Sequence, residues 1–311
     1  MELYATGFNA FRQLEFSQET QQDEQHEPDD LHRFTKILAG HQIEPPRVRL
    51  ASTIVRVDGK ILITGTRDQE DLESAFAAVE TAAGDVFTIV RQPKDNHGLP
   101  GEQLRKNSRN APEADPETWT CSVPIKQMAA YDVGVILLHT DGSVSTMGDP
   151  RFENCLGRPV SDAEPAWKPG KVIDLELVAP VKKVLGGGYT LVTVTEGGDL
   201  YAWGTASGGV HRPRQAFGSL DGTPNYQEVN EDEDVVDAAL GESHALALTR
   251  EGDLYGIGDN GNGQLGLGTE VMRVETWTKL AFDVPEGKEI VGLAAGPRSS
   301  FIITSTTPAE Q

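Results

Sequence analysis

Two overlapping glycine patterns are the residues that most resemble a cofactor-binding site. Segments 256–261 and 261–266 both satisfy G-x-G-x-x-G, a pattern that binds the pyrophosphate of a dinucleotide when it joins a strand to a helix. Here the glycines leave a predicted hairpin and lead to Leu265, with no helical run behind them. We therefore interpret them as turn residues of a repeat, and we predict no cofactor.

Histidines are the second group with the chemistry for a site. They stand at positions 26, 32, 41, 97, 139, 211 and 244, and no two are spaced i,i+2 or i,i+4, so the sequence predicts no metal site. His244 occupies an inner-strand position of a repeat, which favours a packed or hydrogen-bonded role over a catalytic one. The sequence also contains no convincing match to a nucleophile elbow, a phosphate-binding loop or a pair of catalytic carboxylates. We predict no catalytic residue and no enzyme activity.

A small basic cluster is the third group. Arg105, Lys106 and Arg109, with Trp119 nearby, lie in residues 91–120, which are rich in proline, asparagine and charge and lack strand alternation. We predict a long loop insertion at 91–120. Loops of this length either have no role or contact a partner, and these four residues are the candidate partner-contact loop.

A repeated hairpin must position all of these residues. A two-residue turn that ends in glycine is followed six residues later by a second glycine, as from Gly252 to Gly258. Such turns need positive φ, which glycine adopts without strain. Successive second glycines lie 83, 56 and 54 residues apart, and another precedes them by 58 residues. We call them the anchor glycines: Gly7, Gly65, Gly148, Gly204 and Gly258. Trp203, beside one of them, is a predicted core residue.

The two ends of the chain complete one repeat. The segment at 3–14 has the second arm of a hairpin without the first, and 293–304 matches the first arm at 238–249. A repeat split between the termini is expected of a closed β-propeller, which leaves no sheet edge open. We predict an all-β, single-domain propeller over 1–311 with five confident blades, six or seven being allowed. The 83-residue step is either one blade with an insertion or two short blades, since 82–90 reads as a further inner strand.

Two motifs resemble a known repeat. Tyr-x-x-Gly-x-Asn-x-x-x-Gln-Leu at Tyr4–Leu14 and Tyr-Gly-Ile-Gly-Asp-Asn-Gly-Asn-Gly-Gln-Leu-Gly from Tyr255 are similar to the regulator-of-chromosome-condensation repeat. The resemblance spans nearly the whole chain, is most specific at 238–268 and is degraded at 49–66 and 128–157. It implies a propeller, usually of seven blades. It also implies an adaptor or regulatory subunit, since small members partner a histone demethylase or a small zinc-binding protein. The founding member is a chromatin-bound guanine-nucleotide exchange factor for the Ran GTPase.

Charge limits the partners that the chain can bind. Its 48 acidic and 27 basic residues give a formal net charge of −21, which repels phosphate backbones and favours basic partners. Direct nucleic-acid binding is therefore disfavoured. The sequence has no apolar run long enough to span a membrane, no signal peptide at its start, and only Cys121 and Cys155 as thiols. These features favour an intracellular location, cytoplasmic or nuclear.

A binding function is the prediction that these features favour. Rigid blades can display variable loops, so we predict a non-catalytic protein-interaction scaffold or regulatory subunit, either monomeric or part of a hetero-complex. The alternative is a guanine-nucleotide exchange factor for a small Ran-like GTPase. That alternative is weaker because fewer than seven blades are evident, no segment matches the wedge that opens the nucleotide pocket, and no basic tail is visible.

Overall fold

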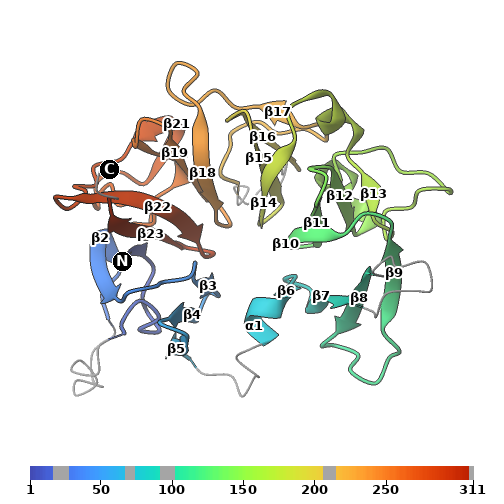
Figure 1. Ribbon diagram of the computed structural model, residues 1–311, viewed down its shortest axis with the longest axis horizontal. Helices are drawn as coiled ribbons and strands as arrows, with labels where there is room; N and C mark the ends of the chain where they lie inside the picture. Colours follow the sequence, from blue (N-terminus) through green and yellow to red (C-terminus); the bar gives the residue numbers. More distant parts are fainter. Residues whose placement is uncertain (17–27, 67–73, 92–101, 206–214, 308–311) are drawn as a thin grey trace. The chain divides into compact units, whose positions relative to one another are not determined.

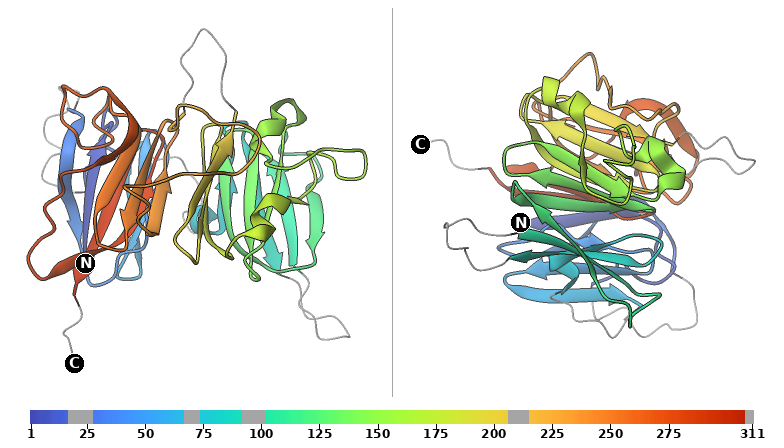
Figure 2. Two further views of the ribbon diagram at one scale, coloured as in Figure 1. Left: turned by 90° about the horizontal axis from the view of Figure 1, so that it is seen from above. Right: turned by 90° about the vertical axis from the view of Figure 1, so that its right-hand side faces the viewer.

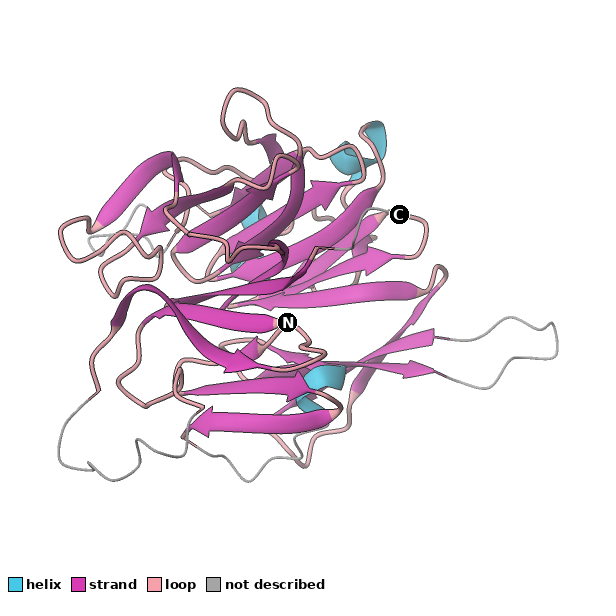
Figure 3. Cartoon of the chain, turned by 60° about the vertical axis from the view of Figure 1, so that its left-hand side comes forward, coloured by secondary structure: helices cyan, strands magenta, loops and turns pink. Residues whose placement is uncertain are grey.

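The chain forms two compact units built almost entirely of antiparallel strands. The computed structural model describes residues 1–16, 28–66, 74–91, 102–205 and 215–307. Unit 1 contains the described residues of Met1–Leu72, Gln215–Gly218 and Val229–Gln311, and unit 2 those of Glu73–Arg214 and Ser219–Glu228. The helices in the described residues are short, from four to six residues each (Figure 3), and none is long and apolar enough to cross a membrane. They are α1 (Ser74–Ala77), η2 (Pro150–Cys155) and η3 (Ile173–Leu177).

Unit 1 contains three of the sheets, which we call blades 1, 2 and 6 (Figure 1). Blade 1 consists of β1 (Glu2–Gly7), β2 (Leu31–Ala39), β22 (Lys288–Ala295) and β23 (Ser299–Thr306). Blade 2 consists of β3 (Arg47–Val48), β4 (Ser52–Val57) and β5 (Lys60–Gly65). Blade 6 consists of β18 (Val235–Leu240), β19 (His244–Thr249), β20 (Leu254–Asp259) and β21 (Arg273–Lys279).

Unit 2 contains blades 3, 4 and 5. Blade 3 consists of β6 (Ala78–Glu80), β7 (Asp85–Arg91), β8 (Glu102–Ser108) and β9 (Glu117–Cys121). Blade 4 consists of β10 (Ile125–Tyr131), β11 (Gly134–His139), β12 (Val144–Gly148) and β13 (Gly170–Lys171). Blade 5 consists of β14 (Val181–Gly187), β15 (Thr190–Thr195), β16 (Leu200–Gly204) and β17 (Asn225–Tyr226).

Strands from both ends of the chain share blade 1, which confirms the prediction for the termini. β1 pairs with β23 in continuous antiparallel register from Glu2 opposite Thr304 to Gly7 opposite Ser299. Figure 2 shows the blue N-terminal and red C-terminal strands side by side. The Glu2 carboxylate accepts hydrogen bonds from Lys288 and Lys36 across this sheet, which lower its pKa to about 2. The ion pairs therefore add to the backbone pairing that joins the two ends.

Blade 3 settles the blade count at six in the described residues and corrects one prediction. β7 is the inner strand expected at 82–90, so the 83-residue step holds two blades rather than one with an insertion. The loop predicted at 91–120 was wrong for 102–108, which is β8, and for 117–120, which belongs to β9; residues 92–101 lie outside the described part. Both strands are mostly polar and buried at few positions, so apolar alternation gave no signal there.

The anchor glycines occupy equivalent register positions in five blades. Gly258 lies opposite His244 with φ of +101°, and a Cβ built on it would lie 2.2 Å from the carbonyl oxygen of Ser243. Neither the dihedral angle nor the space suits a side chain. The pairs are Gly7–Ser299, Gly65–Ser52, Gly148–Gly134, Gly204–Thr190 and Gly258–His244. In blade 3 the same position holds Ser108, opposite Asp85.

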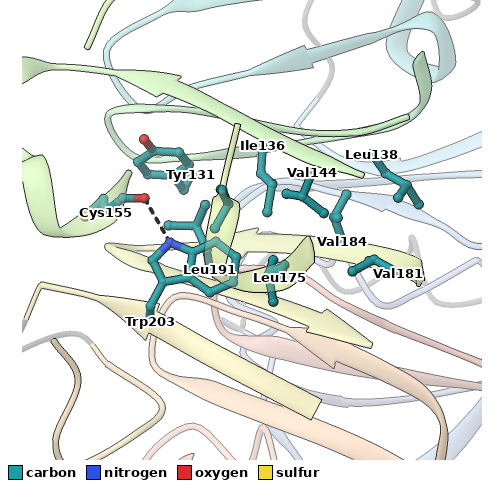
Figure 4. Close-up of a cluster of buried hydrophobic side chains, with 11 residues drawn as sticks. Tyr131, Ile136, Leu138, Val144, Cys155, Leu175, Val181, Val184, Leu191 and Trp203 are labelled. Carbon is teal, nitrogen blue, oxygen red and sulfur yellow. Dashed lines mark hydrogen bonds between the residues drawn. The ribbon is translucent and has the colours of Figure 1, made fainter. Parts of the chain in front are cut away.

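Apolar side chains from blades 4 and 5 form one of the buried clusters (Figure 4). Trp203 is fully buried there among residues that include Tyr131 and Leu191. Its indole Nε1 donates a hydrogen bond to the carbonyl oxygen of Cys155, at 3.3 Å (Figure 4). The ring therefore fills the core and also fixes the loop that follows β12, because a buried indole N–H requires an acceptor.

Candidate protein-interaction surface

Buried amide side chains fix the loop that follows β1. The Asn9 Oδ1 atom accepts a hydrogen bond from the backbone N–H of Leu14, at 3.0 Å, and the Gln13 Oε1 atom accepts one from the N–H of Phe11, at 2.9 Å. Gln13 also donates through Nε2 to the carbonyl oxygens of Phe8 and Leu50, at 2.7 and 3.1 Å. The last bond ties the blade 1 loop to the turn between β3 and β4 of blade 2.

The loop that follows β20 repeats this arrangement. Asn260 accepts from the N–H of Leu265, and Gln264 accepts from the N–H of Asn262, each at 2.9 Å. The Asn-x-x-x-Gln-Leu pattern is thus a loop-forming device, since each amide satisfies backbone groups that the turn leaves open. The side chains between the amides are left to vary. They are Ala10, Phe11 and Arg12 in one loop and Gly261, Asn262 and Gly263 in the other.

Aromatic and cationic side chains gather where the blade 1 loop meets neighbouring turns. Phe11 is 45% exposed, and its ring meets that of Phe8 edge-on with centroids 5.9 Å apart. The Arg298 guanidinium lies over the Phe8 ring, 5.9 Å from its centroid. Leu50 is 42% exposed on the turn that Gln13 ties to Phe8. We call Phe8, Phe11, Arg12, Leu50 and Arg298 the aromatic–arginine patch.

Arg12 holds an unusual backbone conformation within this patch. Its φ is +57°, and its counterpart in the other loop is Gly263, at +80°. A side chain at positive φ costs free energy, so such residues are uncommon and cluster at functional sites. The Arg12 guanidinium pairs with Glu15, at 3.1 Å. The chain therefore keeps a large cation where the repeat geometry favours glycine.

The four candidate residues of the predicted contact loop lie on strands of blade 3 and beside them. Lys106 pairs with Asp85 at 3.2 Å and Glu117 at 3.3 Å; burial opposes its charge, but these carboxylates raise its pKa. Arg109 pairs with Glu80, at 2.5 Å. Trp119 is half-buried against the cluster that contains Phe87 and Leu104, and Arg105 is exposed on β8. Three of the four are thus engaged within the blade, and their role in partner contact remains a prediction.

His244 lies fully buried on β19. Its Nε2 atom lies 2.9 Å from the hydroxyl of Ser300 on β23, so the pair joins blades 6 and 1 within unit 1. Burial lowers the pKa of His244 to about 4, because the charged ring would be desolvated. The ring is neutral at physiological pH and contributes packing and one hydrogen bond.

The two cysteines are free thiols, and neither belongs to a metal site in the described residues. Cys155 is buried and Cys121 half-buried; both are free, and burial raises the pKa of each. Within the residues that the structure describes, no three His, Cys, Asp or Glu side chains come together in a way that could hold a metal ion.

Comparison with known proteins agrees with the repeated loops. The family model of the Regulator of chromosome condensation (RCC1) repeat matches residues 235–264. The chain is 27% identical over 238 residues to the E3 ubiquitin-protein ligase HERC2 of Mus musculus, covering 75% of this chain and 4% of that protein. It is 30% identical over 189 residues to the Regulator of chromosome condensation of Xenopus laevis, covering 60% of this chain and 41% of that protein. The chain thus spans less than half the length of these relatives.

Solved structures show the same fold at low sequence identity. Human WBSCR16 matches with a TM-score of 0.56 and 14% identity over 98% of this chain and 81% of that one. Prp20p from Saccharomyces cerevisiae matches with a TM-score of 0.55 and 14% identity over 99% of this chain and 92% of that one. Blades, anchor glycines and paired Asn–Gln loops define a β-propeller repeat protein. Residues 235–264 match the regulator of chromosome condensation repeat, and the chain is similar to proteins that carry this repeat.

The sequence analysis missed the aromatic–arginine patch. Its members come from the loop after β1, the β3–β4 turn and the β22–β23 turn, which only the fold brings together. One signal was available in the sequence. When the loop after Gly7 is aligned with the loop after Gly258, Phe8 corresponds to Asp259 and Arg12 corresponds to Gly263. A cation opposite a turn glycine marks a departure from repeat geometry that could have identified this loop.

Proposed function

We propose that this chain is a non-catalytic protein-interaction scaffold or regulatory subunit. The observation that supports it best is the aromatic–arginine patch, where exposed apolar side chains and partly exposed arginines lie on adjoining loops, one of which is fixed by buried amides. Aromatic and arginine side chains are enriched at the centres of protein interfaces. Loops that are already ordered lose little entropy on binding, so more of the contact energy appears as affinity.

Relatives support protein partners as the class of ligand. Prp20p from Saccharomyces cerevisiae has binding properties toward Gsp1p and histones, and Kap60 has been solved bound to yeast RCC1 (Prp20). For this chain we propose a protein partner, with basic partners favoured by its overall charge and direct nucleic-acid binding disfavoured. We also propose an intracellular location, a single propeller domain over 1–311, and a monomer or a member of a hetero-complex.

Exchange activity on a small Ran-like GTPase is the alternative. The family resemblance supports it, and exchange works by stabilising the nucleotide-free GTPase, so it needs a binding surface rather than a nucleophile. A fluorescent-nucleotide release assay with a purified Ran-type GTPase tests it directly. If a sub-stoichiometric amount of this protein accelerated nucleotide release from the GTPase, exchange activity would replace the scaffold proposal.

The scaffold proposal is tested by isolating the native complex. Tagged full-length chain is purified from a native lysate, and the complex is sized and its stoichiometry measured by mass spectrometry. A stoichiometric protein partner that co-elutes is expected; elution of the bait alone would overturn the proposal. The contact role of blade 3 is tested by Arg105→Ala on β8, with the exposed Arg33→Ala as its control.

A further inference from the structure

We propose that the aromatic–arginine patch binds an acidic segment of a partner protein that carries large apolar side chains. This inference rests on the proposed scaffold function and specifies the chemistry of the partner at one surface. It also departs from the overall charge of −21, which by itself favours basic partners.

The apolar half of the patch requires an apolar ligand. Phe11 and Leu50 are both more than two-fifths exposed, and they lie on two loops that Gln13 connects. The Phe8 ring meets the Phe11 ring edge-on, with the ring centroids 5.9 Å apart. Two large apolar side chains held together on ordered loops can bury a partner's leucine or aromatic ring without first being ordered.

The cationic half requires negative charge. The Arg298 guanidinium is held over the Phe8 ring, and in the described part of the chain it forms no ion pair with a carboxylate. A guanidinium stacked on an aromatic ring still directs its N–H groups outward, where a carboxylate can accept two of them. Arg12 adds a second cation, and Arg49 is the residue before Leu50. A basic segment would place like charges against these groups.

Carboxylates near the patch already have partners inside the protein. Glu15 accepts from Arg12 and from the side chain of Asn9, at 3.1 and 3.0 Å. Asp30 accepts from the backbone N–H of Asn9 and from the Nδ2 atom of Asn262, each at 2.8 Å. These acidic groups therefore fix the loops, and Arg298 supplies the charge that a ligand would meet.

Selection from a random peptide library on purified full-length chain tests the inference. We expect enrichment of peptides that combine Asp or Glu with Leu or an aromatic residue. The best peptide should bind at least ten-fold more weakly to Phe11→Ser and to Arg298→Glu, and raising the salt concentration should weaken its binding. Matched controls are Leu177→Ser, at a leucine that is 88% exposed in unit 2, and Arg33→Glu on the exposed face of β2. These should change affinity less than two-fold.

Three outcomes of the peptide experiments would overturn the inference. They are enrichment of basic peptides, enrichment of none, or equal losses in the patch variants and their controls, with thermal melts showing that each variant is folded. An oligonucleotide that binds with the same dependence on Phe11 and Arg298 would also overturn it, because the ligand would then be nucleic acid. If the native complex contains a stoichiometric partner whose cross-links avoid the patch, the scaffold proposal stands and this inference fails.

Discussion

Gln127 on β10 exchanges two hydrogen bonds with the backbone of Val184 on β14. Its Nε2 atom donates to the Val184 carbonyl oxygen at 2.8 Å, and its Oε1 atom accepts from the Val184 N–H at 3.2 Å. Asp237 on β18 occupies the equivalent position in blade 6 and accepts from the N–H of Leu293 on β22, at 2.8 Å. Each of these residues follows a register shift near the start of the first strand of its blade. Such a bulge redirects the next side chain, here toward the adjacent blade of the same unit.

Replacing Gln127 should weaken the junction between blades 4 and 5. Gln127→Ala removes both bonds and leaves two backbone groups of Val184 without their partner, so we expect a loss of about 1–3 kcal/mol in the free energy of unfolding. Urea denaturation measures it. The control is Lys126→Ala at the adjacent exposed position, which should stay within about 0.5 kcal/mol. Equal effects of the two changes would show that the amide bridge contributes nothing to stability.

The anchor glycines can be tested by comparing two glycines with similar dihedral angles. Gly258 and Gly252 have φ of +101° and +87°, but a Cβ at Gly258 would lie 2.2 Å from the Ser243 oxygen, whereas one at Gly252 meets nothing within 4 Å. Gly252→Ala should cost about 1 kcal/mol for its positive φ alone. Gly258→Ala should cost about 3 kcal/mol or more, because the backbone must also move.

Thermal and chemical unfolding of both variants measures the difference. It isolates the close approach, since both alanines carry the same unfavourable dihedral region. A Gly258→Ala variant as stable as Gly252→Ala would mean that β19 and β20 can separate without loss, and that the register glycine is not a packing constraint.

His244 should make stability depend on pH in a defined window. Its pKa falls from 6.5 to about 4 on folding because the ring is buried. The native state therefore resists protonation while the unfolded state accepts it, so stability is full above about pH 6.5 and falls as the pH decreases toward 4. The loss approaches about 3 kcal/mol, at 1.36 kcal/mol for each pKa unit, and levels off below pH 4.

Urea midpoints measured every half unit of pH between 7 and 4 test this dependence. His244→Gln cannot gain the proton, so its stability should change less over the same range, although its absolute stability will be lower. Glu2, with a pKa lowered to about 2 by its lysine partners, loses its contribution only below about pH 4.5, which separates the two windows. A wild-type curve parallel to that of His244→Gln would mean that the native ring protonates normally.

The sequence predicted those features of the fold that depend on glycine. Turn glycines such as Gly252 and anchor glycines such as Gly258 both hold positive φ, so their six-residue spacing marks the hairpins, and the pairing of the two termini followed from the same spacing. Blade 3 was only one of two alternatives for the 83-residue step, and its β8 was predicted as loop, because Ser108 holds the register position of a glycine and β8 is polar. The sequence did not predict the aromatic–arginine patch for a different reason. Phe8, Leu50 and Arg298 are brought together by packing between blades, which leaves no periodic pattern along the chain.

Arg12 connects stability with the proposed binding surface. Its φ of +57° in a loop where the counterpart is Gly263 implies that a glycine there would relieve backbone strain. Arg12→Gly should therefore unfold with a free energy about 1 kcal/mol higher than that of Arg12→Ala, which keeps the strain but also lacks the guanidinium. Both variants lose the ion pair with Glu15, so that loss cancels in the comparison.

Affinity for the selected acidic peptide should separate from stability in these variants. Arg12→Gly and Arg12→Ala should both bind the peptide several-fold more weakly than wild type, because each removes one cation from the patch. Denaturation and peptide titration of the same preparations measure the two quantities. A strained residue that is kept for binding predicts that Arg12→Gly is more stable than Arg12→Ala, while both variants bind the peptide more weakly than wild type. If Arg12→Gly bound the peptide as tightly as wild type, the positive φ would have no connection with recognition, and the cationic part of the patch would reduce to Arg298 and its neighbours.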